Sequence, residues 1–444
     1  MSAVIESPKS ESEPEIGNYF VAAYPPFSVW EPRQNKAFLD LLEEPAHAGP
    51  IGIYVHLPFC QKKCDYCYYL SYAGQSLGTI NSYLETVVAE MAKYSQRLAI
   101  NSRPVKFVYI GGGTPSLLSP EQVRFLFSGL QSCQPWDEVE EVTFECAPRS
   151  VRPELLQALK KCGVTRLSMG VQSFNDSLLK LNGRIHQTND VLRAYEMIRK
   201  AKFKWVNLDL MVGLMGEQPA QWCDAVHRAL ELQPDSVTVY QTEIPHNTKI
   251  CRDMESGKLP AALTPWNVKR TRLYYAFHEL ERAGYTIVNG YMAVKNPKKH
   301  HFAYANHLWH GGDMIGLGVA SFGYVNGFHY QNKVTLEDYI MTMARHELPI
   351  KRSYFLSDLD RIVREFVLQL KSGSVSTRCF EKKFHADVLE MFSEPLQKLK
   401  KRGFLVISEN ELGTTVDLTR AGLLCVDRLL PEFYQAEFKD VRYA

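Results

Sequence analysis

The stretch that decides the fold of this chain is Tyr54-Val55-His56-Leu57-Pro58-Phe59-Cys60-Gln61-Lys62-Lys63-Cys64-Asp65-Tyr66-Cys67. It ends an apolar run in three cysteines, Cys60, Cys64 and Cys67, with the spacing C-x3-C-x2-C. Three thiolates at this spacing can bind one iron-sulfur cube and leave its fourth iron without a protein ligand. A structural zinc site would need four ligands, and no second cysteine or histidine pair follows closely enough to complete one. The stretch therefore predicts a cluster with one open iron.

The composition is that of a globular protein of the size of an enzyme. With 444 residues the chain exceeds what one hydrophobic core usually fills, so two folded units are expected. The 51 basic and 49 acidic residues give a net charge of +2, which argues against nucleic acid as a partner. No apolar run approaches the ~20 residues of a membrane span, and no basic and apolar leader opens the sequence. We therefore expect a cytoplasmic protein whose other cysteines are reduced.

Four parts are expected along the chain. Residues 1–16 are rich in Ser, Glu and Pro and predict a disordered tail. Residues 17–48 include the aromatic, proline-interrupted segment 19–30, which predicts an N-terminal arm that either covers the site or only docks on the folded body. Residues 49–350 are assigned to a barrel with a substrate-covering extension, and residues 351–444 to a C-terminal helical domain.

Six short apolar runs alternate with amphipathic helical stretches through the middle of the sequence. Runs rich in β-branched residues and separated in this way predict parallel strands with crossover helices, so the expected fold class is α/β with a partial (β/α)6 barrel. The predicted strands are residues 53–56, 107–110, 142–145, 166–171, 206–211 and 237–240.

The C-terminal domain is expected to be helical and similar to a winged helix. Residues 404–407 and 413–418 predict two strands about a turn, which would form the wing. A DNA-reading role is one alternative for such a domain. The absence of a basic stripe favours the other alternative, a lid on the barrel.

Residues that follow the carboxyl ends of barrel strands face the active site in folds of this kind. The segment Gly111-Gly112-Gly113-Thr114 follows the second strand, and its glycines would let the backbone approach a ligand closely, unless it is only a tight turn. Glu145 ends the third strand, which is otherwise apolar. It is either a ligand contact or a solvated strand end.

Three further polar residues follow the same rule. Gln172 ends the fourth strand, and Arg184 comes after the next turn and helix, so the two could bracket a carboxylate, the arginine through a bidentate fork. Asp209 lies between Leu208 and Leu210, where a carboxylate needs a partner or a ligand amine. Structural salt bridges are the alternative for both charges.

Residues 54–60 read Y-x-H-[IL]-P-F-C, which resembles the signature of the radical S-adenosylmethionine (SAM) enzymes. The narrower resemblance is to the HemN-like branch of oxygen-independent coproporphyrinogen III oxidases, haem chaperones and class C radical methyltransferases, including anaerobic haem-degrading relatives. It extends from about Asn18 to the C-terminus. The resemblance implies that the open iron of a [4Fe-4S] cluster binds SAM and, once reduced by a donor such as flavodoxin or ferredoxin, cleaves it to a 5'-deoxyadenosyl radical.

The resemblance also implies roles for particular residues. Tyr54 and Glu145 are expected to be catalytic and to contact the first SAM. The family's glycine motif, which grips the amino and carboxylate end of SAM, falls on Gly112, Gly113 and Thr114. The residues that match contacts of a second SAM are Tyr66, Gln172, Arg184 and Asp209.

The sequence departs from two of the related groups. Cys67 is followed by Tyr68-Tyr69, where the oxidase carries a further cysteine. Gly290-Tyr291-Met292-Ala293 replaces the oxidase's D-H-F-A segment, and Trp309 alone remains of the chaperone motif H-N-x-x-Y-W. These losses favour a radical C-methyltransferase that uses both SAM molecules.

The expected substrate is a flat, apolar, aromatic or conjugated small molecule, with tetrapyrroles included. It would suit the aromatic arm and Tyr291, Met292, Phe302 and Tyr304. Methylation and cyclopropanation are both open, and a monomer is expected. The alternatives are oxidative decarboxylation of the coproporphyrinogen III oxidase type and non-catalytic haem handling.

Overall fold

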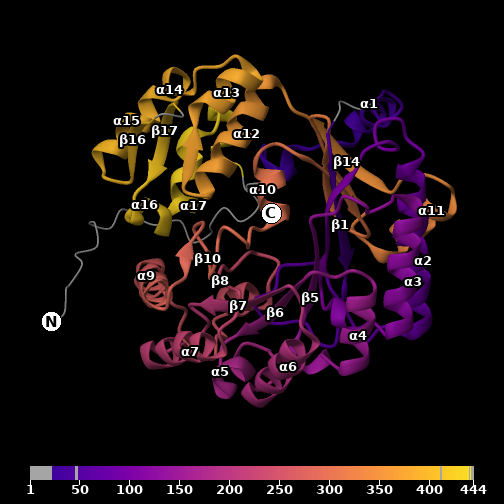
Figure 1. The fold of residues 1–444 in the computed structure, drawn as a ribbon, viewed down its shortest axis with the longest axis horizontal. Helices are drawn as coiled ribbons and strands as arrows, with labels where there is room; N and C mark the ends of the chain where they lie inside the picture. The colour runs from indigo at the N-terminus through magenta and orange to yellow at the C-terminus, as the bar shows by residue number, and fades with distance from the viewer. Residues whose placement is uncertain (1–22, 46–48, 411–412, 440, 442–444) are drawn as a thin grey trace.

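The computed structural model describes residues 23–45, 49–410, 413–439 and 441 (Figure 1). The predicted tail at 1–16 and the start of the arm at 17–22 lie outside the described residues. Within the described ranges, none of the helices combines the length and the apolar character that a bilayer crossing needs.

The centre of the fold is a twelve-stranded sheet in which six parallel strands follow one another in chain order. All six predicted strands are confirmed, each longer by one to four residues. Their side chains are mostly buried on both faces, as expected when helices cover a parallel sheet. The six strands are β1 (Ile51–Leu57), β4 (Val105–Gly112), β5 (Glu141–Cys146), β6 (Arg166–Gln172), β7 (Trp205–Val212) and β8 (Ser236–Gln241).

Helices α2 to α7 connect these strands and α8 and α9 follow the last of them, and the labelled helices lie around the outside of the sheet (Figure 1). Their starts are set locally: Ser119 and Gln122 form a reciprocal capping box, and Pro120 occupies the first helical position. The helices are α2 (Leu77–Ser95), α3 (Pro120–Cys133), α4 (Pro153–Lys161), α5 (Asp176–Leu181), α6 (Thr188–Ala201), α7 (Pro219–Leu232), α8 (Lys249–Glu255) and α9 (Trp266–Arg282).

Additional strands extend the sheet at both edges. A buried ion pair of 2.6 Å between Arg103 and Asp313 fixes the start of β11, which runs parallel to β1. The other additional strands pair antiparallel. They are β11 (Asp313–Leu317), β12 (Phe322–Val325), β13 (Phe328–Asn332) and β14 (Ile350–Phe355) at one edge, and β10 (Met292–Val294) and β9 (Thr286–Ile287) at the other.

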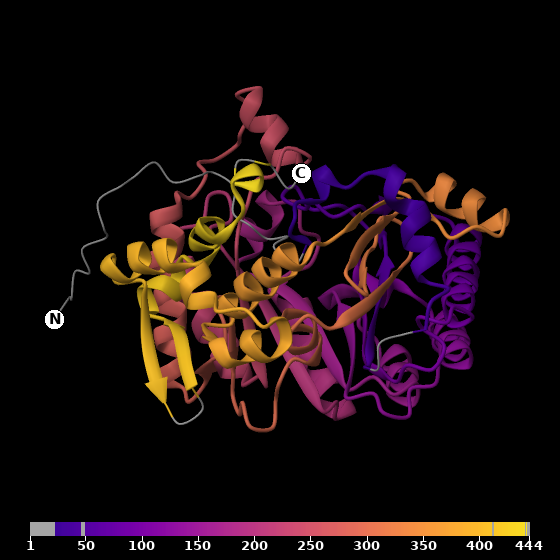
Figure 2. The same cartoon turned by 90° about the horizontal axis from the view of Figure 1, so that it is seen from above.

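The C-terminal part is mainly helical, with a small three-stranded sheet that contains the predicted hairpin (Figure 2). Phe366, Phe392 and Phe433 pack at its centre, and its core is continuous with α10 (Ala303–Trp309). The proposed boundary between residues 350 and 351 remains a prediction, and β14 spans it. The elements are α12 (Asp358–Lys371), β15 (Ser374–Ser376), α13 (Thr377–Phe384), α14 (Val388–Met391), α15 (Ser393–Lys401), β16 (Leu405–Asn410), β17 (Gly413–Leu418), α16 (Arg420–Leu424) and α17 (Val426–Leu429).

The described part of the arm docks on the folded body. Trp30 stacks on His329 of β13, with ring centroids 4.8 Å apart. Tyr24 is fully buried, and its ring lies 4.7 Å from that of Tyr434 near the C-terminus. These contacts favour docking over covering the site. The arm then continues into α1 (Asn35–Leu41).

A buried carboxylate joins the first crossover helix to the extension of the sheet. Glu90 of α2 accepts hydrogen bonds from the Gly318 amide (2.8 Å), the Tyr339 hydroxyl (2.7 Å) and the Asn332 side-chain amide (2.6 Å). Burial raises the pKa of Glu90 from its ordinary value of 4.5 to about 7, and these hydrogen bonds offset part of that rise.

This network makes a pH-dependent prediction. Because the folded-state pKa of Glu90 lies above the unfolded value, the folded state retains a proton that the unfolded state loses, so stability falls as the pH rises from 4.5 to 7. The Glu90→Gln variant lacks this loss. Relative to wild type, its free energy of unfolding should therefore improve by about 3 kcal/mol between pH 5 and pH 8. Urea denaturation at a series of pH values measures the difference, and a pH-independent difference would contradict the assignment.

Candidate active site

The cysteine loop leaves the carboxyl end of β1 and returns along β3. β2 (Phe59–Cys60) pairs with β3 (Tyr72–Ala73), and between them the Cys67 amide donates to the Cys64 carbonyl at 3.2 Å. All three thiols are half-buried. Burial, followed by the charge on Cys64, raises the pKa of Cys67 to about 11. Three thiolates in this setting need a positive centre, which is what an iron-sulfur cluster provides.

Two polar side chains contact the sulfur atoms directly. Arg184 donates to Cys64 Sγ at 3.3 Å and to the Gly170 carbonyl at 2.7 Å, and the Thr114 hydroxyl donates to Cys60 Sγ at 3.6 Å. Hydrogen bonds to cluster sulfurs are a means by which proteins tune the reduction potential. The sequence predicted a ligand carboxylate as the partner of Arg184. The structure adds a cysteine sulfur, which only the folded loop brings within reach.

The loop before Arg184 packs tightly on the cysteine loop. The Asp65 amide donates to the Asn182 carbonyl at 3.3 Å. Gly183 has a φ of +77°, and a Cβ at this position would lie 2.5 Å from Asp65 Oδ1. Glycine is therefore required both by the backbone conformation and by the close approach of Asp65.

The glycine segment after β4 supports the cysteine loop from the other side. The Gly113 amide donates to the Leu57 carbonyl and the Thr114 amide to the Phe59 carbonyl, both at 2.8 Å. A Cβ on Gly113 would lie 2.6 Å from the Phe59 carbonyl oxygen and 3.0 Å from Cys60 Sγ. The glycine at this position is therefore needed to hold Cys60 in place, in addition to any role in ligand binding.

Tyr54 belongs to an ordered pair on β1. Its hydroxyl lies 3.1 Å from Nδ1 of His56, and Nε2 of His56 lies 3.3 Å from the Leu70 carbonyl. Because a carbonyl only accepts, His56 donates from Nε2, and Nδ1 then accepts from Tyr54. Burial lowers the pKa of His56 to about 4, so the ring is neutral near pH 7. The ring fits because Gly112, with a φ of +114°, has no Cβ to displace it.

Glu145 faces the interior of the barrel. Its two oxygens accept from the Tyr109 hydroxyl at 2.6 Å and from the Gly112 amide at 3.1 Å. Burial raises the pKa of this carboxyl. Tyr109 was missed in the sequence, although its place on β4 three residues before Gly112 could have indicated it. These contacts favour a bound carboxylate over the alternative of a solvated strand end, although the side chain is only half-buried.

Asp209 lies in a row of polar side chains across β6, β7 and β8. It accepts from Asn207 at 2.8 Å and from Ser168 at 3.1 Å, and Asn207 in turn accepts from Ser236 at 2.7 Å. Burial, followed by the charge of Glu145, raises the pKa of Asp209 to about 7. The Asn207 and Ser168 side chains that donate to Asp209 are neutral, which argues against the salt-bridge alternative for this residue.

Gln172 and Arg184 both lie beside Gly170. A Cβ on Gly170 would be 2.8 Å from Gln172 Nε2 and 3.6 Å from Arg184 Nη2. Gln172 itself has a φ of +68°, at a shift in the register of β6 on β7. Its Oε1 is buried and has no hydrogen-bond partner within the described residues. Since a buried acceptor without a partner is costly, a ligand donor is expected here.

Tyr66 belongs to the cysteine loop and lies near Arg184. The side chain is buried, and it is close enough to Arg184 and to the Cys64 and Cys67 thiols for their charges to affect its pKa. The structure therefore places Arg184 near both Tyr66 and Gln172, and the binding of one ligand by all three stays a prediction.

Aromatic rings line the barrel interior next to Glu145 and Asp209. Tyr54 and Tyr109 stack with centroids 5.9 Å apart, and Tyr304 lies 5.2 Å from Tyr109. Tyr240 of β8 stacks on Tyr291 at 5.9 Å. Of the residues expected to suit a flat substrate, Tyr291 and Tyr304 belong to this aromatic wall, as does Phe302. Tyr24 and Trp30 of the arm pack elsewhere, and Tyr19 and Phe20 lie outside the described residues.

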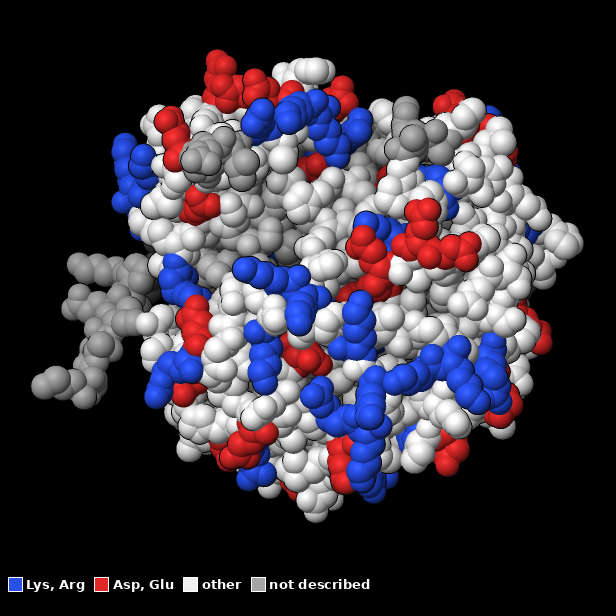
Figure 3. Space-filling view, viewed as in Figure 1, with Lys and Arg blue, Asp and Glu red and all other residues white. Residues whose placement is uncertain are grey.

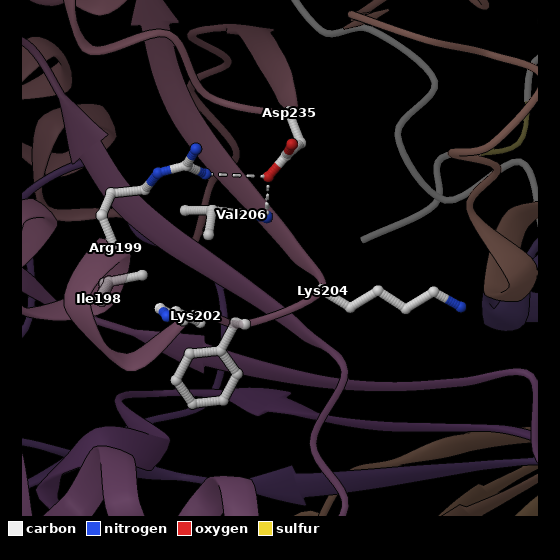
Figure 4. A pocket seen from close by; sticks show the side chains of 7 residues that line it. Ile198, Arg199, Lys202, Lys204, Val206 and Asp235 are labelled. Carbon is white, nitrogen blue, oxygen red and sulfur yellow. Dashed lines mark hydrogen bonds and ion pairs between the residues drawn. The ribbon is translucent and has the colours of Figure 1, made fainter.

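A surface pocket of about 260 Å³ lies at the opposite, amino-terminal ends of the strands (Figure 4). There Asp235 accepts from Arg199 at 3.3 Å and from the Val206 amide at 2.9 Å. The molecular face in Figure 3 carries charges of both signs. Since ligands of such barrels bind at the carboxyl ends of the strands, we do not assign the pocket to the active site.

Comparison with known proteins agrees with this geometry. Residues 54–229 match the Radical SAM superfamily. The chain is 30% identical to the heme chaperone HemW of Bacillus subtilis, over 86% of this chain and 98% of that protein. It is 26% identical to the oxygen-independent coproporphyrinogen III oxidase of Synechocystis, over 86% of this chain and 84% of that protein.

A solved structure shows the same fold. Coproporphyrinogen III oxidase (HemN) from Escherichia coli superposes with a TM-score of 0.77 at 24% identity, covering 90% of this chain and 93% of that one. The partial barrel with its helical C-terminal part is therefore confirmed. The chain belongs to the radical SAM superfamily, in the branch that contains HemW and HemN, and its cofactors are a [4Fe-4S] cluster and SAM.

Proposed function

We propose that this protein cleaves SAM reductively and acts on a flat tetrapyrrole. The observation that carries the proposal is that three cysteine thiols, the half-buried carboxylates of Glu145 and Asp209, and an aromatic wall share the carboxyl-terminal side of one barrel. When bound, the cluster supplies the electron that cleaves SAM. The protein residues position the reactants and exclude water.

The cysteine side of the site would hold the first SAM. Cys60, Cys64 and Cys67 would ligate the cluster, with Thr114 and Arg184 bonded to two of the sulfurs. Glu145 would accept from the ammonium or a ribose hydroxyl of SAM. A cation at this position would also favour the ionised form of Glu145, whose pKa is raised by burial.

Tyr66, Gln172, Arg184 and Asp209 would hold the second SAM. Its donors would satisfy the buried Gln172 Oε1, its carboxylate would face Arg184, and its positive groups would lie near Asp209. The same cation would lower the pKa of Asp209, which stands at about 7 without one.

The substrate proposal rests on the aromatic wall and on the names of the relatives, which refer to haem and coproporphyrinogen. Tyr240 and Tyr291 form a stacked aromatic pair in this wall, and aromatic side chains are the kind that suit a planar ligand. The relatives' names favour oxidative decarboxylation of coproporphyrinogen or haem handling. Radical methyl transfer is the second candidate, because the two-SAM residues are present while the oxidase's extra cysteine is replaced by Tyr68-Tyr69. Three further expectations stay predictions: that the electron donor is a protein such as flavodoxin or ferredoxin, that the protein is a monomer, and that it is cytoplasmic.

Anaerobic turnover tests the function. The reconstituted protein is incubated with SAM, a reductant and either haem or coproporphyrinogen III, and the tetrapyrrole is analysed by mass spectrometry. An added carbon identifies methyl transfer, and loss of carbon dioxide identifies decarboxylation. Binding of haem without SAM cleavage identifies a haem carrier and contradicts the proposal that the protein is an enzyme. Failure to bind any tetrapyrrole overturns the substrate class.

The cluster assignment predicts the effect of removing a ligand. Cys64→Ala should lose the visible iron-sulfur absorption and SAM cleavage together, because Cys64 is a proposed cluster ligand and the acceptor of the Arg184 hydrogen bond. Cys379→Ala is a matched control, since this cysteine is exposed on α13. Iron and sulfide analysis measures the outcome. A Cys64→Ala protein with the full iron content of wild type would refute the assignment.

The second SAM site is tested best at Gln172, because Arg184 also contacts a cluster sulfur. Gln172→Ala should weaken binding of the second SAM by about 1 to 3 kcal/mol, roughly 5- to 150-fold, and spare deoxyadenosine formation from the first. Gln75→Ala, at an exposed position, is the control. Equilibrium dialysis should find two SAM per wild-type chain at saturation. A single SAM per wild-type chain would disprove the second site.

A further inference from the structure

A second group of metal-ligating side chains lies outside the cysteine loop. His246 Nδ1 is 3.8 Å from Cys251 Sγ, Cys251 Sγ is 3.6 Å from Glu255 Oε1, and His246 Nδ1 is 3.9 Å from Glu255 Oε1. The three atoms therefore form a nearly equilateral triangle. Each of the three residues offers one ligand atom, and among the described residues these ligand atoms all lie within 4.8 Å of one another, as binding to a single metal ion requires.

The dimensions of the triangle suit one tetrahedral metal ion. Zinc binds thiolate sulfur at ~2.3 Å and imidazole nitrogen or carboxylate oxygen at ~2.0 to 2.2 Å, which places neighbouring ligand atoms roughly 3.3 to 3.8 Å apart. The observed separations need to contract by only a few tenths of an ångström. A mixed set of thiolate, imidazole and carboxylate favours zinc over magnesium or calcium, which prefer oxygen ligands.

The local fold creates this arrangement. Cys251 and Glu255 are four residues apart in α8 and so lie on the same face of the helix. Thr248 caps the helix by accepting from the Cys251 amide at 3.2 Å and donating to the Pro245 carbonyl at 2.7 Å. This turn brings His246 back over the first turn of α8. Cys251 is buried whereas His246 and Glu255 are exposed, so a fourth position for water is open to solvent.

The same segment contacts the cysteine loop. The Ile250 amide donates to the Asp65 carbonyl at 3.1 Å, and Lys249 forms an ion pair with Asp65 at 3.4 Å. The Asn247 side chain donates to the Tyr68 carbonyl at 3.0 Å. Whatever fixes residues 246–255 therefore also stabilises the loop that carries Cys64 and Cys67.

We propose that His246, Cys251 and Glu255 bind one zinc-class divalent cation, with water as the fourth ligand. The cation joins the turn before α8 to the helix and so braces the cysteine loop from outside. This site is independent of the tetrapyrrole proposal, because its ligands take no part in binding SAM or substrate.

Metal analysis of the full-length, cluster-reconstituted protein tests the site. The protein is mixed with one equivalent of zinc and passed through a desalting column. Wild type and the Cys379→Ser control should retain about one zinc per chain in addition to the cluster iron. His246→Ala and Cys251→Ser should bind zinc at least about tenfold more weakly. His246 is exposed, so its variant remains informative if replacement of the buried Cys251 disturbs folding.

Cobalt provides the second measurement. Cobalt bound by the wild-type protein should show a thiolate-to-metal charge-transfer band that His246→Ala weakens and Cys251→Ser abolishes. Hydrogen exchange should show slower exchange at residues 62–69 in the zinc-loaded wild type than in the zinc-free protein. Zinc retention by both variants at the wild-type level, or no zinc in wild type, would overturn the proposal.

Discussion

The structure depends on the close packing of the cysteine loop against two glycines, Gly113 and Gly183. Cys60 is held in place because Gly113 allows the glycine segment to approach within hydrogen-bonding distance of Leu57 and Phe59. On the other side, Gly183 admits Asp65. A Cβ at either glycine would displace the loop, and with it a cysteine. The sheet beneath, ordered from β1 to β8, serves to bring these two glycine turns to the same edge.

Electrostatics explains why the site suits charged cofactors. Arg184 is half-buried beside Cys64, whereas Glu145 and Asp209 are half-buried carboxylates whose pKa values are raised. Buried charges are costly unless paired. In the proposed arrangement, the first SAM would offer a positive group to Glu145, and the second would offer its carboxylate to Arg184 and a positive group to Asp209. SAM has this charge pattern, and the aromatic wall beside it provides ring surfaces for a planar partner.

Much of the fold could be predicted because the signals are local in the sequence. Alternating apolar runs marked all six barrel strands, and Ser119 and Gln122 marked a helix start that the structure confirms. The edge strands were missed because β9 and β10 are two and three residues long, too short to show a period, and β11 is positioned by the distant pair of Arg103 and Asp313.

The sequence by itself determined the cysteine spacing, the order of the parallel strands and the residues that follow their carboxyl ends, because these properties depend on distances along the chain. Only the tertiary structure decided which side chains meet. Arg184 bonds to Cys64 across 120 residues, and Tyr109 bonds to Glu145 across 36. Such contacts depend on the twist of the sheet and on loop packing, which no local pattern encodes. For the same reason the unpartnered Gln172 oxygen became visible only in the folded protein.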